Sequence, residues 1–464
     1  MRTLRLAIVV GALFALTLPV MAQTSYILTL PSSVDVQSFA ASHGLTVVSE
    51  IRDGSTCTYV VSSVSSDVIA VETEVETDLR VSSFEPNAAV SLPETLNGLT
   101  GPVLTQSTAG ILETLPGRTL VSFFGSTVPS NYISQTATTI IRLPDARAAF
   151  PITGAGTIAI IDTGVDPQHP ALAGVLVPGF DFTHNTAGVP SEFSDLSQDA
   201  VAQINQSTAG ILEQQNVVPL NSYAAAILDQ STAGILEGLV PQDFGHGTMT
   251  AGVAHLVAPT AKIMPIKAFS ADGTATESNI IQAIYFAADH GANVISMSFS
   301  MPVSSPSLQT AVQYALGKGI VVIASSGNDG LKTLVYPASI GGVQGVGSSS
   351  NLDVRSTFSN YGSGVVLLAA PGEGVITTYP GGNYAAGWGT SFSAPMVAGA
   401  ASLVLQARPN SKPGDVLNAL SKAKSIGSDM GYGRIDLYQA LFNLLGNTST
   451  SGTSGSTSGG SSKL

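Results

Sequence analysis

The chain of 464 residues has few covalent or electrostatic means of holding a fold together. Its single cysteine, Cys57, excludes a disulfide within the chain, so an exported fold would depend on the size of its core. Charged residues make up only 11% of the sequence, and the formal net charge is −13. No basic cluster is present, which argues against nucleic acid or an anionic membrane surface as a partner.

Long apolar runs are also scarce, and the one that stands out is N-terminal. The basic start MRTLR is followed by an apolar run over residues 6–18 and by small residues that end at Ala22. This pattern is typical of a secretory signal peptide, which we expect at 1–22. A membrane anchor, the alternative, would need a longer apolar run. We therefore expect a secreted, extracellular protein with no membrane span after signal removal. The ending Ser462-Lys463-Leu464 matches a peroxisomal address, but a signal peptide directs the chain elsewhere.

Residues 23–92 read as a small α+β domain. Four segments have strand character, SYILTL, TVVSEI, CTYVVS and RVSSFEPNAAVSL, and two have helical character, VDVQSFAASHG and SDVIAVETEVET. Their order predicts β-α-β-β-α-β. Such an order serves many unrelated functions, so it indicates none by itself.

The pattern changes twice after this domain. Residues 93–135 lack periodicity and read as a junction. Over 136–445, strands without polar alternation, such as 157–162, 262–269, 293–299 and 319–325, are separated by helical stretches. Strands buried on both faces and spaced by helices predict an α/β fold with a doubly wound, mainly parallel sheet. Ligands of such sheets bind beyond the carboxyl ends of the strands. The Ser/Thr/Gly-rich segment 446–464 is typical of a flexible tail.

The octapeptide QSTAGILE occurs three times, at 106–113, 206–213 and 230–237. The copies are scattered, so they do not form a solenoid. They are either a binding or processing element or a duplicated segment tolerated in surface loops. We favour the second interpretation because long loop insertions cost little.

Three glycine-flanked runs carry groups for nucleophilic catalysis. TIAIIDTGVDPQHP ends a buried strand at Asp162, DFGHGTMTAGVAH begins a small-residue helix at His246, and GTSFSAPMVAG puts Ser391 at the start of a buried helix. A serine hydroxyl becomes a nucleophile when an imidazole takes its proton, and a buried carboxylate must hold that imidazole in one tautomer. Each residue alone could be a cap or a turn residue. The three together favour a catalytic triad.

An oxyanion donor completes the expected site. In ASSGNDG, Asn328 follows a buried strand, and its side-chain amide could donate to the oxyanion that forms on attack. The backbone N–H of Ser391, at a helix N-terminus, would be the second donor.

The segments around Asp162, His246, Asn328 and Ser391 resemble those of the subtilisin-like serine proteases. The similarity runs from about 140 to 445 and includes GYGRIDLYQAL. The N-terminal domain resembles the inhibitory prodomain of that family. The resemblance implies a secreted serine endopeptidase that cleaves extended polypeptides through an acyl-enzyme. It also implies a zymogen whose prodomain assists folding and inhibits the enzyme from within the chain, and we expect a monomer.

The resemblance further implies the residues that bind substrate. Two stretches would pair with the substrate backbone, Ser298-Phe299-Ser300 and Gly273-Thr274-Ala275. The first specificity pocket would also include Ser325, Ser326 and Gly327, whose small side chains leave room for sizeable apolar groups. Asp329 at its rim would accept lysine or arginine. The family position at Tyr336-Pro337 predicts a cis peptide bond.

Several positions depart from the family pattern. Residues 184–242 look like an insertion between Asp162 and His246, and Met249 and Met396 replace frequent histidines. An aspartate of the family's tight calcium site is replaced by Ala171, and 254–259 leave no room for its loop. Since calcium needs six to eight oxygen ligands, we predict that this site is absent, that no cofactor is required and that no residue is a metal ligand. A second, weak calcium site elsewhere remains open.

Two alternatives to an active protease remain. One is a non-catalytic secreted binding protein built on the same scaffold and using the inserted loop. The intact set Asp162, His246, Asn328 and Ser391 argues against it. The other is a peptidase that never releases its prodomain and stays latent.

Overall fold

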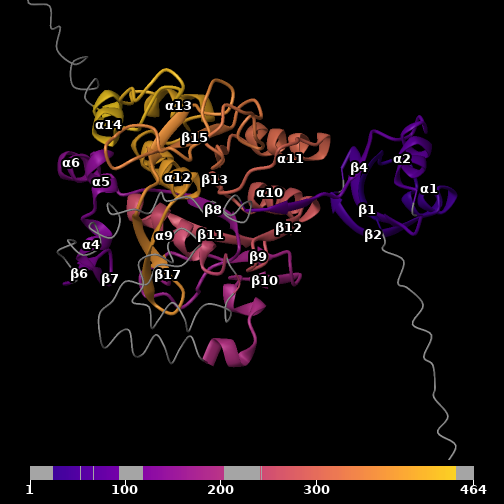
Figure 1. Cartoon of the computed structure of the whole chain (residues 1–464), viewed down its shortest axis with the longest axis horizontal. Helices are drawn as coiled ribbons and strands as arrows, with labels where there is room; N and C mark the ends of the chain where they lie inside the picture. Colours follow the sequence, from indigo (N-terminus) through magenta and orange to yellow (C-terminus); the bar gives the residue numbers. More distant parts are fainter. Residues whose placement is uncertain are drawn as a thin grey trace, which may run out of the picture. The chain divides into compact units, whose positions relative to one another are not determined.

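A computed structural model of the chain describes residues 24–92 except 53 and 66, 119–202, 241 and 243–445 (Figure 1). The expected signal peptide, residues 93–118 of the junction, all three octapeptides and the tail lie outside these residues. The described chain divides into two compact units, with the boundary between Pro86 and Asn87.

The first unit has the expected β-α-β-β-α-β order. Its four strands form one antiparallel sheet in the order β2-β3-β1-β4. The side chains of Tyr26, Phe39 and Val61 form the centre of its core. Asp35 and Asp67 cap the two helices by accepting backbone N–H groups, as sequences with Asp before an apolar helix predict. The elements are β1 (Thr24–Pro31), α1 (Val36–Ser42), β2 (Leu45–Arg52), β3 (Thr56–Ser63), α2 (Val68–Glu76) and β4 (Ser83–Pro86).

An eight-stranded sheet forms the centre of the second unit, in the order β10-β9-β11-β8-β13-β14-β15-β16. All neighbours in it run parallel except β9 and β10, which confirms the mainly parallel sheet. The strands are β8 (Thr157–Asp162), β9 (Gly179–Asp181), β10 (Thr186–Gly188), β11 (Lys262–Lys267), β13 (Val294–Met297), β14 (Val321–Ser325), β15 (Gln344–Ser349) and β16 (Leu368–Pro371).

Helices pack against this sheet in two pairs. Helices α9 (His246–Val257) and α12 (Thr390–Ala407) pack against each other and against the central strands. Helices α10 (Glu277–Asp289) and α11 (Pro306–Gly317) form the second pair (Figure 1). Every residue of α9 is buried, which explains why its sequence has small or apolar side chains in all directions.

Smaller elements surround this core. The two-stranded ribbon β17–β18 packs on α9, and the strands β5 and β12 form a separate antiparallel pair. The remaining elements are β5 (Ala89–Ser91), β6 (Leu120–Phe123), β7 (Ser126–Pro129), α4 (Ser130–Ile133), α5 (Thr136–Ile140), α6 (Leu143–Ala149), the 3₁₀ helix η2 (Glu192–Asp195), β12 (Thr274–Thr276), β17 (Val375–Tyr379), β18 (Asn383–Gly387), α13 (Pro413–Leu420) and α14 (Leu437–Leu445).

Two expected segments differ in detail from the structure. The strand expected within 80–92 is two strands, and the second of them, β5, belongs to the second unit. The expected insertion 184–242 contributes β10 to the central sheet, and its helix η2 carries the fully buried Glu192. The start of this segment is therefore part of the core of the second unit.

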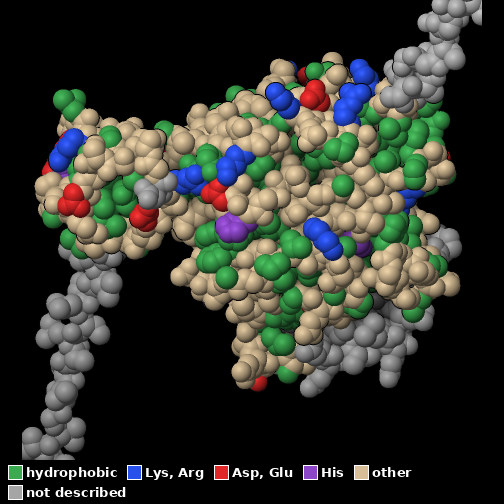
Figure 2. Space-filling view, turned by 180° about the vertical axis from the view of Figure 1, so that it is seen from behind, with side chains coloured by type: hydrophobic (Ala, Val, Ile, Leu, Met, Phe, Trp, Pro, Cys, Tyr) green, Lys and Arg blue, Asp and Glu red, His purple; other side chains and the backbone are tan. Residues whose placement is uncertain are grey.

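Three smaller features concern the surface and the backbone. On the face in Figure 2, the Lys, Arg, Asp and Glu side chains lie in a few small groups of both signs, with wide uncharged areas between them. Among the described residues, no helix combines the length and the apolar character that crossing a membrane requires. The peptide bond between Tyr336 and Pro337 is cis, as expected.

Candidate active site

Asp162 and His246 form a buried pair at the carboxyl end of the central sheet. Asp162 is the last residue of β8, and His246 is the first residue of α9. Nδ1 of the imidazole lies 2.7 Å from Oδ1 of the carboxylate. The side chain of His246 is 4% exposed and that of Asp162 is 1% exposed, so little water competes for this hydrogen bond. Because a carboxylate only accepts, Nδ1 carries the proton, which leaves Nε2 as the basic nitrogen.

Further donors hold the carboxylate of Asp162. The backbone N–H of Thr163 donates to Oδ1 over 2.8 Å, and the hydroxyl of Thr250 donates to Oδ2 over 3.1 Å. Oδ1 therefore accepts from the imidazole and from the Thr163 backbone, and Oδ2 accepts from Thr250. These hydrogen bonds fix the plane of the carboxylate.

Ser391 is the second residue of α12, immediately after a turn that only glycine adopts easily. Gly389 has φ 141° and ψ 160°, and the helix begins at Thr390. The hydroxyl of Ser391 donates to the carbonyl of Ser298 over 3.2 Å, and the hydroxyl of Ser298 donates to the carbonyl of Ser391 over 2.9 Å. The serine thus lies at a helix N-terminus, where backbone N–H groups point outward.

The side-chain amide of Asn328 is held in one orientation beside this helix. Its Oδ1 accepts the backbone N–H of Thr390 over 2.9 Å and the Thr390 hydroxyl over 2.8 Å. With the oxygen engaged in this way, the NH₂ group is the end of the amide that can donate to another group. The residue follows β14, at the same edge of the sheet as Asp162.

The stretch Gly273-Thr274-Ala275 accepts an extended segment of the same unit. Strand β5 pairs antiparallel with β12, with Ser91 opposite Thr274 and Val90 opposite Ala275. The backbone N–H of Leu92 donates to the carbonyl of Gly273 over 2.9 Å. Val90 and Leu92 are 4% and 0% exposed, so the side chains of this strand are buried as well as its backbone.

The expected pocket residues lie close together after β13 and β14. The hydroxyl of Ser325 donates to the carbonyl of Phe299 over 3.3 Å, and Gly327 has φ 89°. A Cβ at Gly327 would lie 2.5 Å from Nδ2 of Asn360 and 3.3 Å from Oγ of Ser300, so the narrow packing requires glycine. Ser298, Phe299, Ser325 and Ser326 are buried.

Asp329 has a polar partner that the sequence did not indicate. Nδ2 of Asn360 donates to its Oδ2 over 3.0 Å, and the Asp329 backbone N–H donates to Oδ1 of Asn360 over 3.1 Å. The side chain itself is exposed. The carboxylate of Asp329 thus already accepts one hydrogen bond from within the protein.

Several residues next to the Asp162–His246 pair were not singled out from the sequence. Thr250 contacts Asp162 directly, and Glu192 binds the beginning of the His246 helix through Gly247 and Thr248. Thr248 and Thr250 lie two and four positions after His246 in the sequence, so their place beside it could have been predicted. Glu192 lies in an irregular polar segment, and no sequence pattern indicated its position.

The position expected to lack calcium is filled by apolar and aromatic side chains. Ala171 is 2% exposed and belongs to a cluster with Phe123, Tyr132, Leu256 and Tyr384. Within the described residues, no group of three or more His, Cys, Asp or Glu side chains could hold a metal ion.

The mainly parallel sheet, the Asp162–His246 pair at its carboxyl edge and the serine at a helix N-terminus define the class of α/β serine hydrolases. The comparison with known families specifies the class further. Residues 154–455 match the model of the subtilase family, peptidase family S8. The chain therefore belongs to the subtilase family and is a subtilisin-like serine protease.

Individual relatives support this assignment. The chain is 34% identical to thermitase from Thermoactinomyces vulgaris over 313 residues, which cover 65% of this chain and 93% of thermitase. It is 33% identical over 286 residues to a thermophilic serine proteinase from Bacillus sp. (strain AK1), covering 61% of each chain. A solved structure of a protease from Pseudoalteromonas arctica matches with a TM-score of 0.52 at 24% identity, over 66% of this chain and 94% of that one, and it supports the fold.

Proposed function

We propose that the chain is a serine endopeptidase that hydrolyses extended polypeptides through an acyl-enzyme. The observation that carries the proposal is the buried 2.7 Å hydrogen bond between His246 and Asp162 at the carboxyl edge of the sheet, where Ser391 of α12 binds Ser298 directly after β13. His246 takes the hydroxyl proton of Ser391 while Oγ attacks the scissile carbonyl, and it returns that proton to the leaving amine. Asp162 keeps the imidazole in the required tautomer.

Asn328 and the backbone N–H of Ser391 stabilise the negative oxygen of the tetrahedral intermediate. The argument for Asn328 is its orientation: because Thr390 holds Oδ1, the NH₂ group is directed to other acceptors. Donors fixed before the reaction cost no reorganisation when charge develops, which makes them effective.

Substrate binds as an added strand. The pairing of β5 with β12 supports this proposal, because β12 there accepts an extended chain through main-chain hydrogen bonds. Ser298, Phe299 and Ser300 form the opposite side of the substrate site, and Ser325, Ser326 and Gly327 complete the first specificity pocket. Its small side chains favour sizeable apolar groups.

The N-terminal unit acts as an intramolecular inhibitor, and the protein is made as a zymogen. Residues 89–91 already occupy β12, so the chain that follows the first unit competes with substrate for the same strand. The signal-like segment 1–22 supports secretion. We further propose a monomer that lacks the tight calcium site of its family, since a packed apolar cluster surrounds Ala171.

Fluorophosphonate labelling of secreted protein tests this function. We expect labelling of the wild type and none of Ser391→Ala, and N-terminal sequencing should find a product that begins after residue 92. Labelling that persists in Ser391→Ala would contradict the proposed nucleophile. A full-length product that takes up no label would favour the latent peptidase.

A further inference from the structure

Glu192 is a fully buried carboxyl group beside the catalytic pair. It begins the helix η2, and its side chain is 0% exposed. Oε1 accepts the backbone N–H of Gly247 over 3.0 Å and the hydroxyl of Thr163, and Oε2 accepts the hydroxyl of Thr248. The three donors flank Asp162 and His246 in sequence, since Thr163 follows Asp162 directly and Gly247 follows His246.

The hydroxyls of Thr163 and Thr248 each accept a backbone N–H and donate to Glu192. Oγ1 of Thr163 accepts the N–H of Gly247 over 2.9 Å, and Oγ1 of Thr248 accepts the N–H of Asp166 over 2.8 Å. Each hydroxyl has one proton, and Glu192 is the acceptor for it. The contact of Thr163 Oγ1 with Asp162 Oδ1 is long, at 3.4 Å. Glu192 therefore draws the Thr163 proton away from Asp162, whose Oδ1 accepts from His246 and from the Thr163 backbone.

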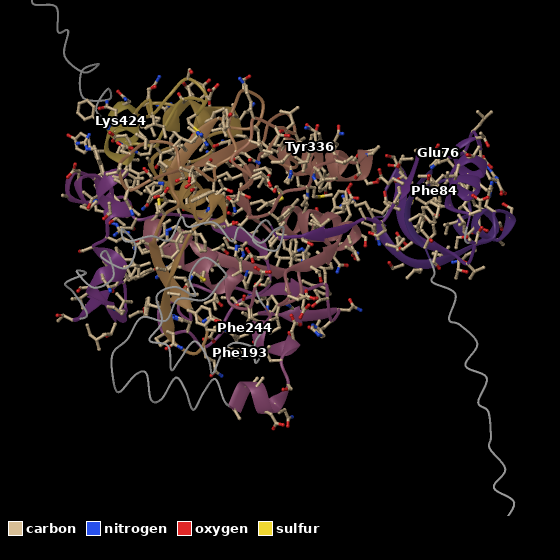
Figure 3. The ribbon with its side chains drawn as sticks, viewed as in Figure 1. Glu76, Phe84, Phe193, Phe244, Tyr336 and Lys424 are labelled. Carbon is tan, nitrogen blue, oxygen red and sulfur yellow. The ribbon has the colours of Figure 1, made fainter. Side chains whose placement is uncertain are left out.

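These contacts connect the end of β8 to the start of α9, the two elements that carry the catalytic pair. The elements approach so closely that a Cβ at Gly247 would lie 2.1 Å from the carbonyl oxygen of Gly164. The next residue, Phe193, packs edge-to-face on Phe244 with ring centroids 5.4 Å apart (Figure 3). Helix η2 is thereby fixed on the loop that leads into His246.

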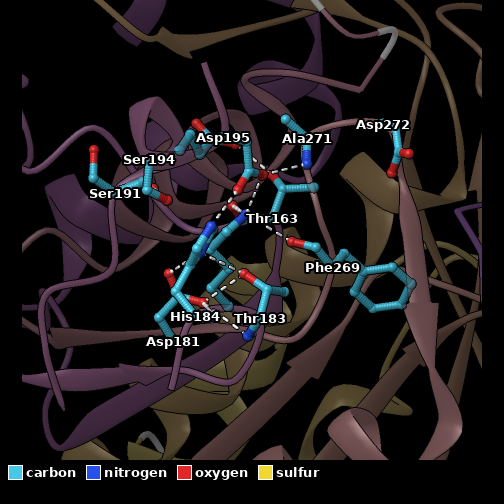
Figure 4. Close-up of polar contacts among 12 residues, drawn as sticks. Thr163, Asp181, Thr183, His184, Ser191, Ser194, Asp195, Phe269, Ala271 and Asp272 are labelled. Carbon is cyan, nitrogen blue, oxygen red and sulfur yellow. Dashed lines mark hydrogen bonds and ion pairs between the residues drawn. The ribbon is translucent and has the colours of Figure 1, made fainter. Parts of the chain in front are cut away.

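A buried cation lies on the other side of Thr163. Nζ of Lys267 donates to the carbonyls of Thr163 and Phe269 over 2.8 Å each and to Asp195 over 2.7 Å (Figure 4). Asp195 also accepts the backbone N–H of Ala271. The network thus continues from Glu192 through Thr163 to the loop that precedes β12.

The pKa of Glu192 is raised to about 7, mainly by burial and partly by the charge of Asp162, although hydrogen bonds from Thr163 and Thr248 and the charge of Lys267 act in the opposite direction. At alkaline pH the group is a carboxylate, and all three of its contacts are donors. Three titratable groups act on its charge directly: Asp162 on β8, Lys267 on β11 and Tyr379 on β17. Three more are linked to its neighbours: Asp166 through Thr248, Asp195 through Lys267, and His246, which precedes Gly247.

We propose that Glu192 is a positioning residue of the protease reaction. Its carboxylate holds Thr163 and Thr248 so that Asp162 and His246 keep their relative placement. Its negative charge, added to that of Asp162, stabilises the imidazolium that forms when His246 takes the proton of Ser391. The inference rests on the proposed function, because it assigns Glu192 a part in the same proton transfer.

The test compares Glu192→Gln with the wild type, per active site labelled by a fluorophosphonate. We expect kcat to fall by roughly 10- to 100-fold, as when hydrogen bonds to a charged group are lost, with KM within about twofold. The acid limb of the kcat/KM profile should move to lower pH, because the imidazolium loses a stabilising charge. Wild-type kcat and pH profile per labelled site, with only a lower yield, would overturn the proposal.

Asp353→Asn is the matched control for a structural carboxylate. Asp353 binds Arg434 and Lys424 through hydrogen bonds of 2.9 Å and 2.6 Å. We expect this variant to unfold at a lower temperature while each labelled site keeps the wild-type kcat and pH profile. A shifted profile in this variant as well would show that lost stability alone moves it, which overturns the proposal.

A second pair of variants covers the case in which Glu192→Gln does not fold. Thr248→Val removes one donor to Glu192, and Thr248→Ser keeps its hydroxyl. We expect Thr248→Val to lower kcat and shift the acid limb, and Thr248→Ser to restore both. Equal losses in the two variants would overturn the positioning role. Wild-type protein without Ser391-dependent labelling would instead overturn the proposed function itself.

Discussion

Nδ1 of His246 lies 2.7 Å from Oδ1 of Asp162, although 84 positions separate the two residues in the sequence. The strand that ends at Asp162 and the helix that begins at His246 are both buried, so the pair is held by the core of the fold. This relationship leads directly to the first prediction.

Asp162→Asn should lower kcat by about 10⁴, the loss seen for the equivalent change in another serine protease. An amide NH₂ can donate to Nδ1, and it then favours the tautomer whose Nε2 carries a proton and cannot accept one. KM should change little. Steady-state kinetics per folded protein measures the effect. Asp289→Asn is the control, since that aspartate, the last residue of α10, pairs with Lys318 directly after α11. A loss below about tenfold would contradict the role of Asp162.

The sequence predicted those parts of the fold that depend on local pattern. Buried strands such as 157–162 show no polar alternation, and the structure has β8 at Thr157–Asp162. Asp162, His246, Asn328 and Ser391 were found because each ends or follows a buried strand or begins a buried helix, with a glycine within two residues. These are positions where an α/β sheet presents side chains to a ligand.

Features that depend on distant contacts were not predicted. Glu192 lies in a short polar segment without periodicity, and its burial depends on Thr163 and Thr248 meeting around it. Residues 80–92, expected to be one strand, form two, β4 and β5, on either side of Asn87 and Ala88. The partner of β5 is β12, more than 180 residues later, and no local pattern specifies such a pairing.

Asn328→Ala should lower kcat by about 10² to 10³ with KM nearly unchanged, a magnitude established on subtilisin itself for the loss of one oxyanion donor. The amide acts on charge that develops only in the transition state, which is why ground-state binding is spared. Kinetics per fluorophosphonate-labelled site measures the change. The exposed Asn418→Ala on α13 serves as the control. A rise in KM at constant kcat would assign Asn328 to substrate binding.

Ala171→Asp should destabilise the protein and should not create a calcium site. The side chain would enter the cluster of Phe123, Tyr132, Leu256 and Tyr384, where a carboxylate lacks oxygen ligands to share an ion with. An uncompensated buried charge costs about 3 to 5 kcal/mol of unfolding free energy.

Thermal unfolding with calcium and with chelator measures this effect, best in a Ser391→Ala background that prevents autolysis. The exposed Ala173→Asp, two positions away, is the matched control and should be nearly neutral. If calcium raised the unfolding temperature of Ala171→Asp but not that of Ala173→Asp, the other oxygen ligands of the site would be present, and the prediction that this variant creates no calcium site would be wrong.

His255 should make the folded state sensitive to acid. Its ring is 1% exposed and packs edge-to-face on Phe123 at 5.4 Å, and within the described residues neither ring nitrogen has a hydrogen-bond partner. Burial, together with the charges of Arg147 and His169, lowers the pKa of His255 to about 4. The pKa of His255 in the folded state thus lies below its unfolded value of about 6.5. The contribution of the neutral imidazole to the free energy of unfolding is therefore fully present above pH 6.5 and is lost as the pH falls toward 4.

The corresponding variant is His255→Phe, which keeps the aromatic contact with Phe123 and removes the titration. A shift from 6.5 to about 4 corresponds to a loss of about 3 kcal/mol across this pH range, which the variant should largely abolish. Urea unfolding at pH 7.5 and pH 4.5 in the Ser391→Ala background measures it. His290→Gln replaces an exposed imidazole and is the control, so it should lose as much unfolding free energy between pH 7.5 and pH 4.5 as the wild type does. Equal acid losses in His255→Phe and the wild type would mean that other groups cause them.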